Sequence, residues 1–141
     1  MEYIKKTLMF YKKLEEVTKT DGETPFNSTE LQLLRELAFA KMENRRLIST
    51  QIAKLLGVTR SSVSQMVNKL EIQGVVKRVP DEIDRKIAYI EMTEESEQLC
   101  GAELEKWTTG MTRITKAFGK EKMEKMIALL EEFVSIAEKM Q

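Results

Sequence analysis

The stretch STQIAKLLGVTRSSVSQMVN, residues 49–68, has the residue spacing of a helix-turn-helix. Ala53, Gly57 and Val63 take the fifth, ninth and fifteenth places of this twenty-residue unit. Two short helices that cross at about 90–120° approach closely near Ala53, where a side chain larger than a methyl group would hold them apart. Gly57 is expected to end the first helix with a positive φ, which glycine adopts without steric cost. The stretch therefore predicts two helices joined by a tight turn.

The second helix of this unit carries a polar outer face. Thr59 is expected to open the helix, because its hydroxyl can accept hydrogen bonds from the free amides of the first turn. Apolar residues turn inward, and five polar residues remain mostly outward: Arg60, Ser61, Ser62, Ser64 and Gln65. Such groups at the start of a helix reach base edges and phosphates in the major groove of DNA. Any small helical protein can show such intervals by chance, but the flanking segments extend the pattern and favour a recognition helix.

Composition bounds the class of protein. A chain of 141 residues is long enough for one domain with a core, and 42% hydrophobic with 33% charged residues fits a soluble globular protein. A single cysteine excludes an internal disulfide, and no apolar run approaches the ~20 residues that span a bilayer. The first residues lack the apolar stretch of a signal peptide. We expect a cytoplasmic protein with no membrane partner.

The net charge is zero, but its distribution is uneven. Residues 45–86 hold nine basic and four acidic residues, a local charge of +5, whereas residues 1–44 carry −1 and residues 87–141 carry −4. Acidic flanks would direct the cationic middle toward phosphates. Solvated helix faces can also produce such an imbalance by chance.

Segments before residue 49 predict two further helices. Residues 2–18 have apolar positions at spacings of three and four, typical of an amphipathic helix. Asn27 and Glu30 have the spacing of a capping box for a second helix. That helix is expected to turn four residues inward: Leu31, Leu34, Leu37 and Ala38. Ser49 is expected to cap the first helix of the turn unit.

A β-hairpin is predicted directly after the recognition helix, which should run from Arg60 to Gln73. Residues 75–79 and 86–92 alternate as strands around a turn-like segment. A hairpin in this place is the wing of a winged helix, and its edges and tip carry Lys77, Arg78, Arg85 and Lys86. Arginine in a wing can follow the phosphate backbone or enter a narrow minor groove. Asp84 and Arg85 can also pair and hold the loop, and both roles are compatible.

Two helices are expected after the wing, over residues 94–116 and 120–140. The second carries one wide apolar stripe: Met123, Met126, Ile127, Leu130, Phe133, Val134, Ala137 and Met140. Burying such a side chain is worth about 1.5–3 kcal/mol, so a partner surface is implied. The helix over residues 2–18 offers a matching face. Together these helices predict a dimer interface, with packing inside one chain as the alternative.

Three groups of residues together resemble the MarR family of bacterial transcription regulators over nearly the whole chain. They are the run Gly57 to Ser64, the pattern Leu70-Glu71-x-x-Gly74-Val75-Val76, and the wing triplet Asp84-Arg85-Lys86. The chain departs from the family at Ser96, where many members have glycine. The resemblance implies a mainly α fold with a small β-hairpin wing. In that fold, residues 27–93 form the winged helix-turn-helix, and residues 1–26 and 94–141 form a helical dimerisation region.

The same resemblance implies a homodimer that reads a pseudo-palindrome in double-stranded DNA, acts as a repressor and holds an effector between its two parts. Two recognition helices about 34 Å apart would meet successive major grooves. The implied base or nearby phosphate contacts are Ser61, Ser62, Ser64, Gln65 and Asn68. The implied phosphate contacts are Arg60 and Lys69, with Arg85 acting from the wing, and Thr59 and Lys86 complete the set. Gln65 can form two hydrogen bonds with adenine, whereas a serine is too short to discriminate strongly.

The sequence says less about the signal to which such a regulator would respond than about its DNA contacts. Some relatives sense peroxides through a cysteine of the N-terminal helix, but Cys100 follows the wing and the chain has no histidine to activate it. A buried, inert Cys100 is favoured, with thiol sensing as an alternative. One cysteine and no histidine disfavour a metal site, and we expect no cofactor. Methionines with Trp107 and Phe39 could line a site for a small lipophilic or aromatic effector, although methionines at helical spacing are more often core.

The sequence disfavours two other function classes. An enzyme is not expected, because the chain has no histidine, no glycine-rich phosphate loop and no serine or cysteine beside a base in a recognisable motif. A winged helix can also bind protein instead of DNA, since a fold does not fix a function. The basic wing and polar recognition face favour DNA over that alternative.

Overall fold

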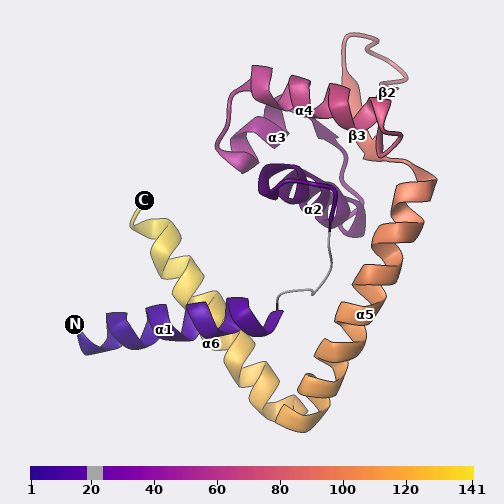
Figure 1. Ribbon diagram of the computed structural model, residues 1–141. Coiled ribbons are helices and arrows are strands. Elements are labelled where there is room, and N and C mark those ends of the chain that lie inside the picture. Colours follow the sequence, from indigo (N-terminus) through magenta and orange to yellow (C-terminus); the bar gives the residue numbers. More distant parts are fainter. Residues whose placement is uncertain (19–23) are drawn as a thin grey trace. The chain divides into compact units, whose positions relative to one another are not determined.

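The computed structural model describes residues 1–18 and 24–141, with their side chains except those of residues 18, 102–104 and 106–107. The chain divides into two compact units, residues 1–93 and 94–141 (Figure 1). The first holds α1 (Glu2–Thr18), α2 (Ser28–Met42), β1 (Leu47–Ile48), α3 (Ser49–Leu56), α4 (Arg60–Ile72), β2 (Val76–Pro80) and β3 (Ala88–Met92). The second holds α5 (Glu94–Phe118) and α6 (Lys120–Lys139). The predicted fold class, mainly α with a small β wing, is confirmed.

Helix α2 begins at the predicted capping box. The Asn27 side-chain oxygen accepts from the Glu30 N–H at 2.9 Å, and the Glu30 carboxylate accepts from the Asn27 N–H at 3.0 Å. The buried face of the helix differs from the expected one. It is formed by Glu30, Leu33, Leu34, Leu37 and Ala40, while Leu31 and Ala38, expected inward, are only partly buried. The buried face of α2 is thus rotated about the helix axis from the face that its apolar residues predict. This rotation places the Glu30 side chain inside.

The helix-turn-helix forms as its spacing predicts. Gly57 follows α3 with φ 66° and ψ 32°, and the Thr59 hydroxyl accepts from the Ser62 N–H at 3.1 Å at the start of α4. The expected cap at Ser49 is wrong. Strand β1 keeps Ile48 extended, so Ile48 takes the N-cap position, its N–H donates to the Gln51 side-chain oxygen at 3.0 Å, and Ser49 is already helical.

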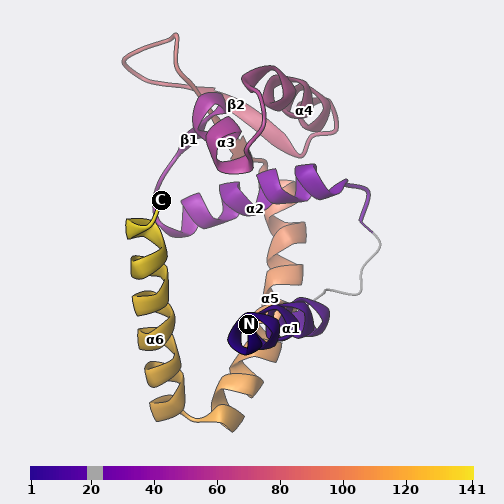
Figure 2. The same cartoon turned by 90° about the vertical axis from the view of Figure 1, so that its left-hand side faces the viewer.

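The wing is the predicted hairpin with an additional strand. Strands β2 and β3 are antiparallel, and β1 pairs with the other edge of β3 to give the order β1-β3-β2. Helices α3 and α4 lie beside this sheet and α2 packs on α3 and β3, as both ribbon views show (Figures 1 and 2). The core of the unit is built from Leu33, Ile52, Val63, Val67, Leu70, Val76 and Ile90, each at most 2% exposed.

The end of the wing is fastened to the end of the recognition helix. Gly74 follows α4 with φ 70°, and the Thr93 hydroxyl donates to the Gly74 carbonyl at 2.7 Å. The Thr93 N–H also donates to the Val75 carbonyl at 3.0 Å. The base of the hairpin, where β2 begins and β3 ends, is therefore held close to the end of α4.

In the second unit, α5 and α6 meet at Gly119, which has φ 94°, and contact each other. No residue of α6 is buried. The apolar stripe predicted on this helix is solvent-exposed at Ile127, Leu130, Phe133 and Val134, among others. Along the described residues, no helix combines the length and apolar character that crossing a bilayer requires.

Candidate nucleic-acid interface

The N-terminal turn of α4 presents most of the predicted polar face to solvent. Arg60, Ser61, Ser62 and Gln65 are exposed, while Ser64 is half-buried. The Thr59 hydroxyl accepts from the Ser62 N–H and donates to the Ser62 Oγ at 2.9 Å. Thr59 is thus committed to capping the helix, and the exposed side chains that follow it stand at a helix N-terminus, where negative charge is favoured.

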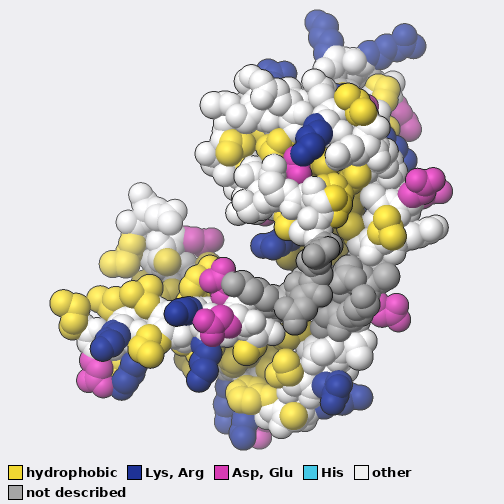
Figure 3. Space-filling model, viewed as in Figure 1, with side chains coloured by type: hydrophobic (Ala, Val, Ile, Leu, Met, Phe, Trp, Pro, Cys, Tyr) yellow, Lys and Arg dark blue, Asp and Glu magenta, His cyan; other side chains and the backbone are white. Residues whose placement is uncertain are grey.

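The nine basic residues between positions 45 and 86 separate into two groups. Four of them bind carboxylates: Arg45 with Glu43, Arg46 with Glu91, Lys69 with Glu30, and Arg78 with Glu71. The other five are exposed and have no ion-pair partner among the described residues: Lys54, Arg60, Lys77, Arg85 and Lys86. Lys and Arg side chains protrude at the end of the space-filling view that holds the β2–β3 loop (Figure 3). Within residues 45–86, the positive charge without an ion-pair partner therefore stands on α3, the start of α4 and the wing.

Lys69, expected at a phosphate, has another partner. Its Nζ lies 2.6 Å from Oε1 of Glu30, which is 2% exposed, whereas the Lys69 side chain is 52% exposed. The hydrogen bond from Lys69 is the main cause that lowers the pKa of Glu30, and burial of the carboxylate opposes it. Lys69 therefore has a structural role, because its ion pair with Glu30 joins α4 to the first turn of α2.

Asn68, expected to contact DNA, is exposed on α4 and is bound by the wing. Arg78 of β2 donates from Nη2 to the Asn68 Oδ1 at 2.7 Å, and the Nη1 side of the same guanidinium pairs with Glu71. From the sequence, Arg78 is expected only as a cation of the wing, and its contact with Asn68 is an additional role. Glu71 and Arg78 lie on either side of the turn at Gly74, and this opposite-charge pairing across a turn was the available signal.

The wing loop is organised by Asp81. Its Oδ2 accepts from the N–H groups of Ile83 and Asp84 at 3.0 and 2.9 Å, and its Oδ1 accepts from the Tyr89 hydroxyl at 2.9 Å. These bonds, that from the Asp84 N–H first, lower the pKa of Asp81, and the carboxylate in turn raises the pKa of Tyr89. The loop that carries Arg85 and Lys86 is therefore held in place by hydrogen bonds of its own.

Asp84 and Arg85 do not pair in this loop. Asp84 Oδ1 accepts from the backbone N–H of Lys86 at 3.0 Å, and the Arg85 guanidinium has no partner within the described part of the chain. The two roles considered for the triplet are thus divided between residues. Asp84 shapes the backbone, and Arg85 and Lys86 present charge.

Arg46, the residue immediately before edge strand β1, supports the wing. Its guanidinium lies 4.1 Å from the centre of the Tyr89 ring, and its Nε is 2.7 Å from the Glu91 carboxylate. A guanidinium stacked on an aromatic ring and paired with a carboxylate is a stable arrangement. Arg46 thereby fixes the Tyr89 ring whose hydroxyl binds Asp81.

Cys100 lies on α5 and is half-buried. Burial first, and the nearby Glu97 second, raise the pKa of its thiol. A protonated thiol is a poor nucleophile, so the surroundings of Cys100 disfavour redox sensing. Among the described residues, no group of three or more histidine, cysteine, aspartate or glutamate side chains could hold a metal ion.

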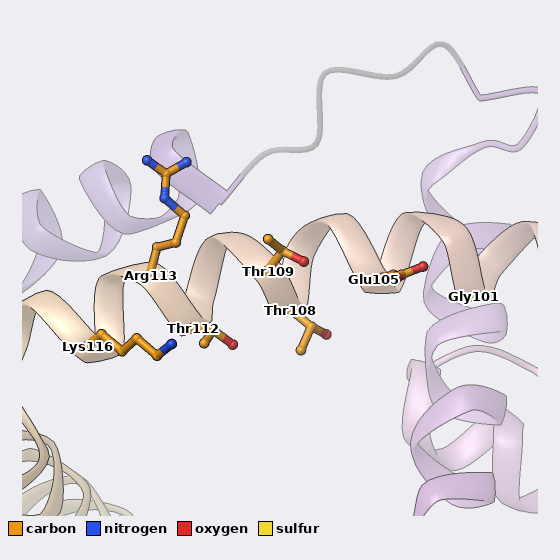
Figure 4. A pocket seen from close by; sticks show the side chains of 7 residues that line it. All are labelled: Gly101, Glu105, Thr108, Thr109, Thr112, Arg113 and Lys116. Atoms are coloured by element: carbon orange, nitrogen blue, oxygen red, sulfur yellow. The ribbon is translucent and has the colours of Figure 1, made fainter.

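A concavity of about 530 Å³ lies along α5, and its lining residues all belong to that one helix: Gly101, Glu105, Thr108, Thr109, Thr112, Arg113 and Lys116. Figure 4 shows Arg113 pointing away from the side of the helix on which Thr112 and Lys116 lie. Phe39 is exposed, and the Trp107 side chain is outside the described residues. An effector site built from these aromatic residues therefore stays a prediction.

Known proteins resemble this chain both in sequence and in fold. A model of the MarR family matches residues 25–87. The regulator YybA of Bacillus subtilis, described as an uncharacterised helix-turn-helix-type transcriptional regulator, is 32% identical over 57 residues, which cover 40% of this chain and 38% of YybA. The aligned part is thus little more than a third of that relative.

Two solved structures share the fold over nearly the whole chain. A MarR-like transcriptional regulator from Thermotoga maritima has a TM-score of 0.73 at 22% identity, covering 96% of this chain and 95% of its own. FabT of Streptococcus pneumoniae, solved in complex with DNA, has a TM-score of 0.69 at 20% identity, covering 99% and 96%. The chain therefore has the winged-helix fold of these two structures.

Proposed function

From the match of the MarR-family model to residues 25–87, we propose that the protein is a MarR-like, sequence-specific DNA-binding transcription regulator that acts as a homodimer. The observation that carries the proposal is a set of five exposed cations within residues 45–86 that have no ion-pair partner among the described residues. Lys54, Arg60, Lys77, Arg85 and Lys86 lie on α3, the start of α4 and the wing. Phosphate contacts supply much of the affinity for DNA. Lysine and arginine side chains that are not already bound to a carboxylate are best able to make these contacts.

The sequence-reading part of the proposal rests on the exposed polar side chains of α4. Ser61, Ser62 and Gln65 stand within its first turns, and Asn68 follows one turn later. Gln65 is the longest of them that has no hydrogen-bond partner among the described residues, and it can form a two-bond contact with adenine. Lys69 is assigned to the ion pair with Glu30 instead of a phosphate.

The dimer and the operator are inferred together. Apolar side chains on α1 and α6 are exposed to an extent that suits a protein partner better than water. Two copies related by a two-fold axis would present two recognition helices to a pseudo-palindromic site. We propose that occupancy of such a site represses transcription. YybA is a transcriptional regulator by its own description, and FabT was solved in complex with DNA.

The test is selection of fragments from a genomic library by the purified protein, followed by titration of the best site at two salt concentrations. We expect enrichment of a pseudo-palindrome and an affinity that falls steeply as salt rises. Arg85→Ala should weaken binding to all sequences, and Gln65→Ala should relax the preference at particular bases.

The matched control is Arg35→Ala, which removes an exposed arginine of α2 outside the cluster and should leave the affinity near that of the parent protein. Unchanged affinity and base preference in both Arg85→Ala and Gln65→Ala would remove these residues from the interface. Absence of any sequence preference in the parent protein, with binding insensitive to salt, would favour a winged helix that binds protein.

A further inference from the structure

We propose that Arg78 determines how Asn68 reads DNA, by occupying the amide oxygen and leaving Asn68 to act only as a hydrogen-bond donor. This inference rests on the proposed function and deepens it, since it names the chemistry that one position of the site would recognise. Arg78 acts here as a positioning residue through Asn68 and need not touch a base itself.

The geometry determines which way the Asn68 amide faces. Arginine has only donors, so the atom of Asn68 that lies 2.7 Å from Nη2 must be the carbonyl oxygen. The other side of the guanidinium pairs with Glu71, so the Arg78 fork is held by two residues of α4 at once. Arg78 itself is 32% exposed and lies on β2, whose position is fixed by pairing with β3. The amide oxygen of Asn68 is therefore bound before any DNA arrives.

The amide nitrogen is the part of Asn68 that remains available, because the residue is exposed. An asparagine that recognises adenine uses both ends of its amide, accepting from the N6 amino group and donating to N7. A second donor at the Asn68 oxygen would have to approach beside the Arg78 guanidinium, whose positive charge repels an amino group. Two N–H donors remain, and their natural partners are acceptors in the major groove or a phosphate oxygen. Guanine offers O6 and N7 and thymine offers O4, whereas the N7 acceptor of adenine stands beside an amino donor that finds no free acceptor on Asn68.

The distinguishing experiment compares base preferences of the parent protein, Arg78→Met and Asn68→Ala by selection from a randomised DNA library. In the parent protein, one position in each half-site should prefer guanine or thymine over adenine, and Asn68→Ala should lose that preference. Arg78→Met releases the amide oxygen, so adenine should gain at the same position by roughly tenfold. The double variant, Arg78→Met with Asn68→Ala, should show no adenine gain.

Two further variants separate positioning from charge. Lys77→Met removes the neighbouring exposed cation of β2, which has no ion-pair partner among the described residues, and should weaken binding uniformly without changing base preference. Arg78→Lys keeps the charge and one donor for the Asn68 oxygen, and should restore part of the parent preference. A purely structural role for Arg78 would change affinity alone.

The outcomes are separable from the proposed function. If the parent protein selects no sequence, the proposed function itself fails. If it selects a sequence and Arg78→Met binds with the same base preference, the inference about Arg78 is wrong. If Arg78→Met does not fold, Asn68→Ala decides, because an unchanged preference in that variant shows that Asn68 reads no base.

Discussion

Gly57 is the residue on which the turn between α3 and α4 depends. Its φ of 66° lies in the left-handed region, and a Cβ placed there would meet no atom within 4 Å. The cost of a side chain is therefore conformational strain and not a clash. We expect Gly57→Ala to lower the free energy of unfolding by about 1 kcal/mol, measured by urea denaturation.

Gly110 provides the matched control, because an added Cβ also meets open space and its φ is not positive. Inside α5, Gly110→Ala should raise the free energy of unfolding by about 0.5–1 kcal/mol. Equal effects of the two substitutions would show that the conformation at Gly57 carries no special cost.

Residue roles that depend on near neighbours in sequence could be predicted, and those that depend on the fold could not. Gly57, Thr59 and the Asn27–Glu30 box act within four residues of themselves, so their types and spacing were sufficient. Lys69 pairs with a residue 39 positions away, and Arg78 with one 10 positions away. Nothing in the local pattern distinguishes Lys69 from Arg85, which has no such partner among the described residues.

The ion pair between Glu30 and Lys69 joins two helices, and its effect on stability should depend on pH. The folded-state pKa of Glu30 is lowered, chiefly by the hydrogen bond from Lys69. A group with a lowered folded-state pKa contributes stability above its unfolded pKa and loses that contribution as the pH falls through its folded pKa. Measured as urea midpoints, stability should therefore decrease as the pH falls below about 4.5, the ordinary value for glutamate.

Glu30→Gln tests this assignment, because the amide keeps the shape of the side chain but does not titrate. The dependence of the urea midpoint on pH below about 4.5 should be shallower in this variant. Lys69→Met leaves the buried carboxylate without its cation and should cost about 1–3 kcal/mol at neutral pH. A pH dependence identical to that of the parent protein in Glu30→Gln would show that other carboxylates account for it.

At the level of elements, the helices and the hairpin followed from periodicity, and β1 did not. A strand of two residues, Leu47–Ile48, is too short to show alternation, and it forms because β3 offers a free edge. The same strand displaced the expected cap from Ser49 to Ile48. The shift of the α2 face toward Leu33 and Ala40 likewise reflects packing partners that a single helix does not reveal.

The proposed dimer gives a prediction for the molecule as a whole. Phe133 of α6 is 67% exposed in the single chain, and burying such a side chain contributes about 1.5–3 kcal/mol. In a symmetric interface the loss counts twice, so Phe133→Asp should shift the protein toward monomers at micromolar concentration in sedimentation experiments. Affinity for a two-half-site operator should fall by about 10²-fold or more, since the second recognition helix is no longer tethered to the first.

Glu132→Gln is the control for Phe133→Asp, because it alters charge beside the apolar stripe without altering the stripe. It should leave the sedimentation profile unchanged. A Phe133→Asp protein that remains dimeric would place the interface on another surface and would separate the dimer from the exposed face of α6.

The hydrogen bonds that Asp81 makes in the wing have a thermodynamic consequence for complex formation. A loop that is disordered when free must lose its conformational entropy on binding, which reduces the affinity obtained from each contact. Here the backbone around Arg85 and Lys86 is ordered by Asp81 and Asp84 within the free chain. In the proposed complex, the wing would therefore meet a duplex as a preorganised surface, and the freedom left to be lost there would be mainly that of two long side chains.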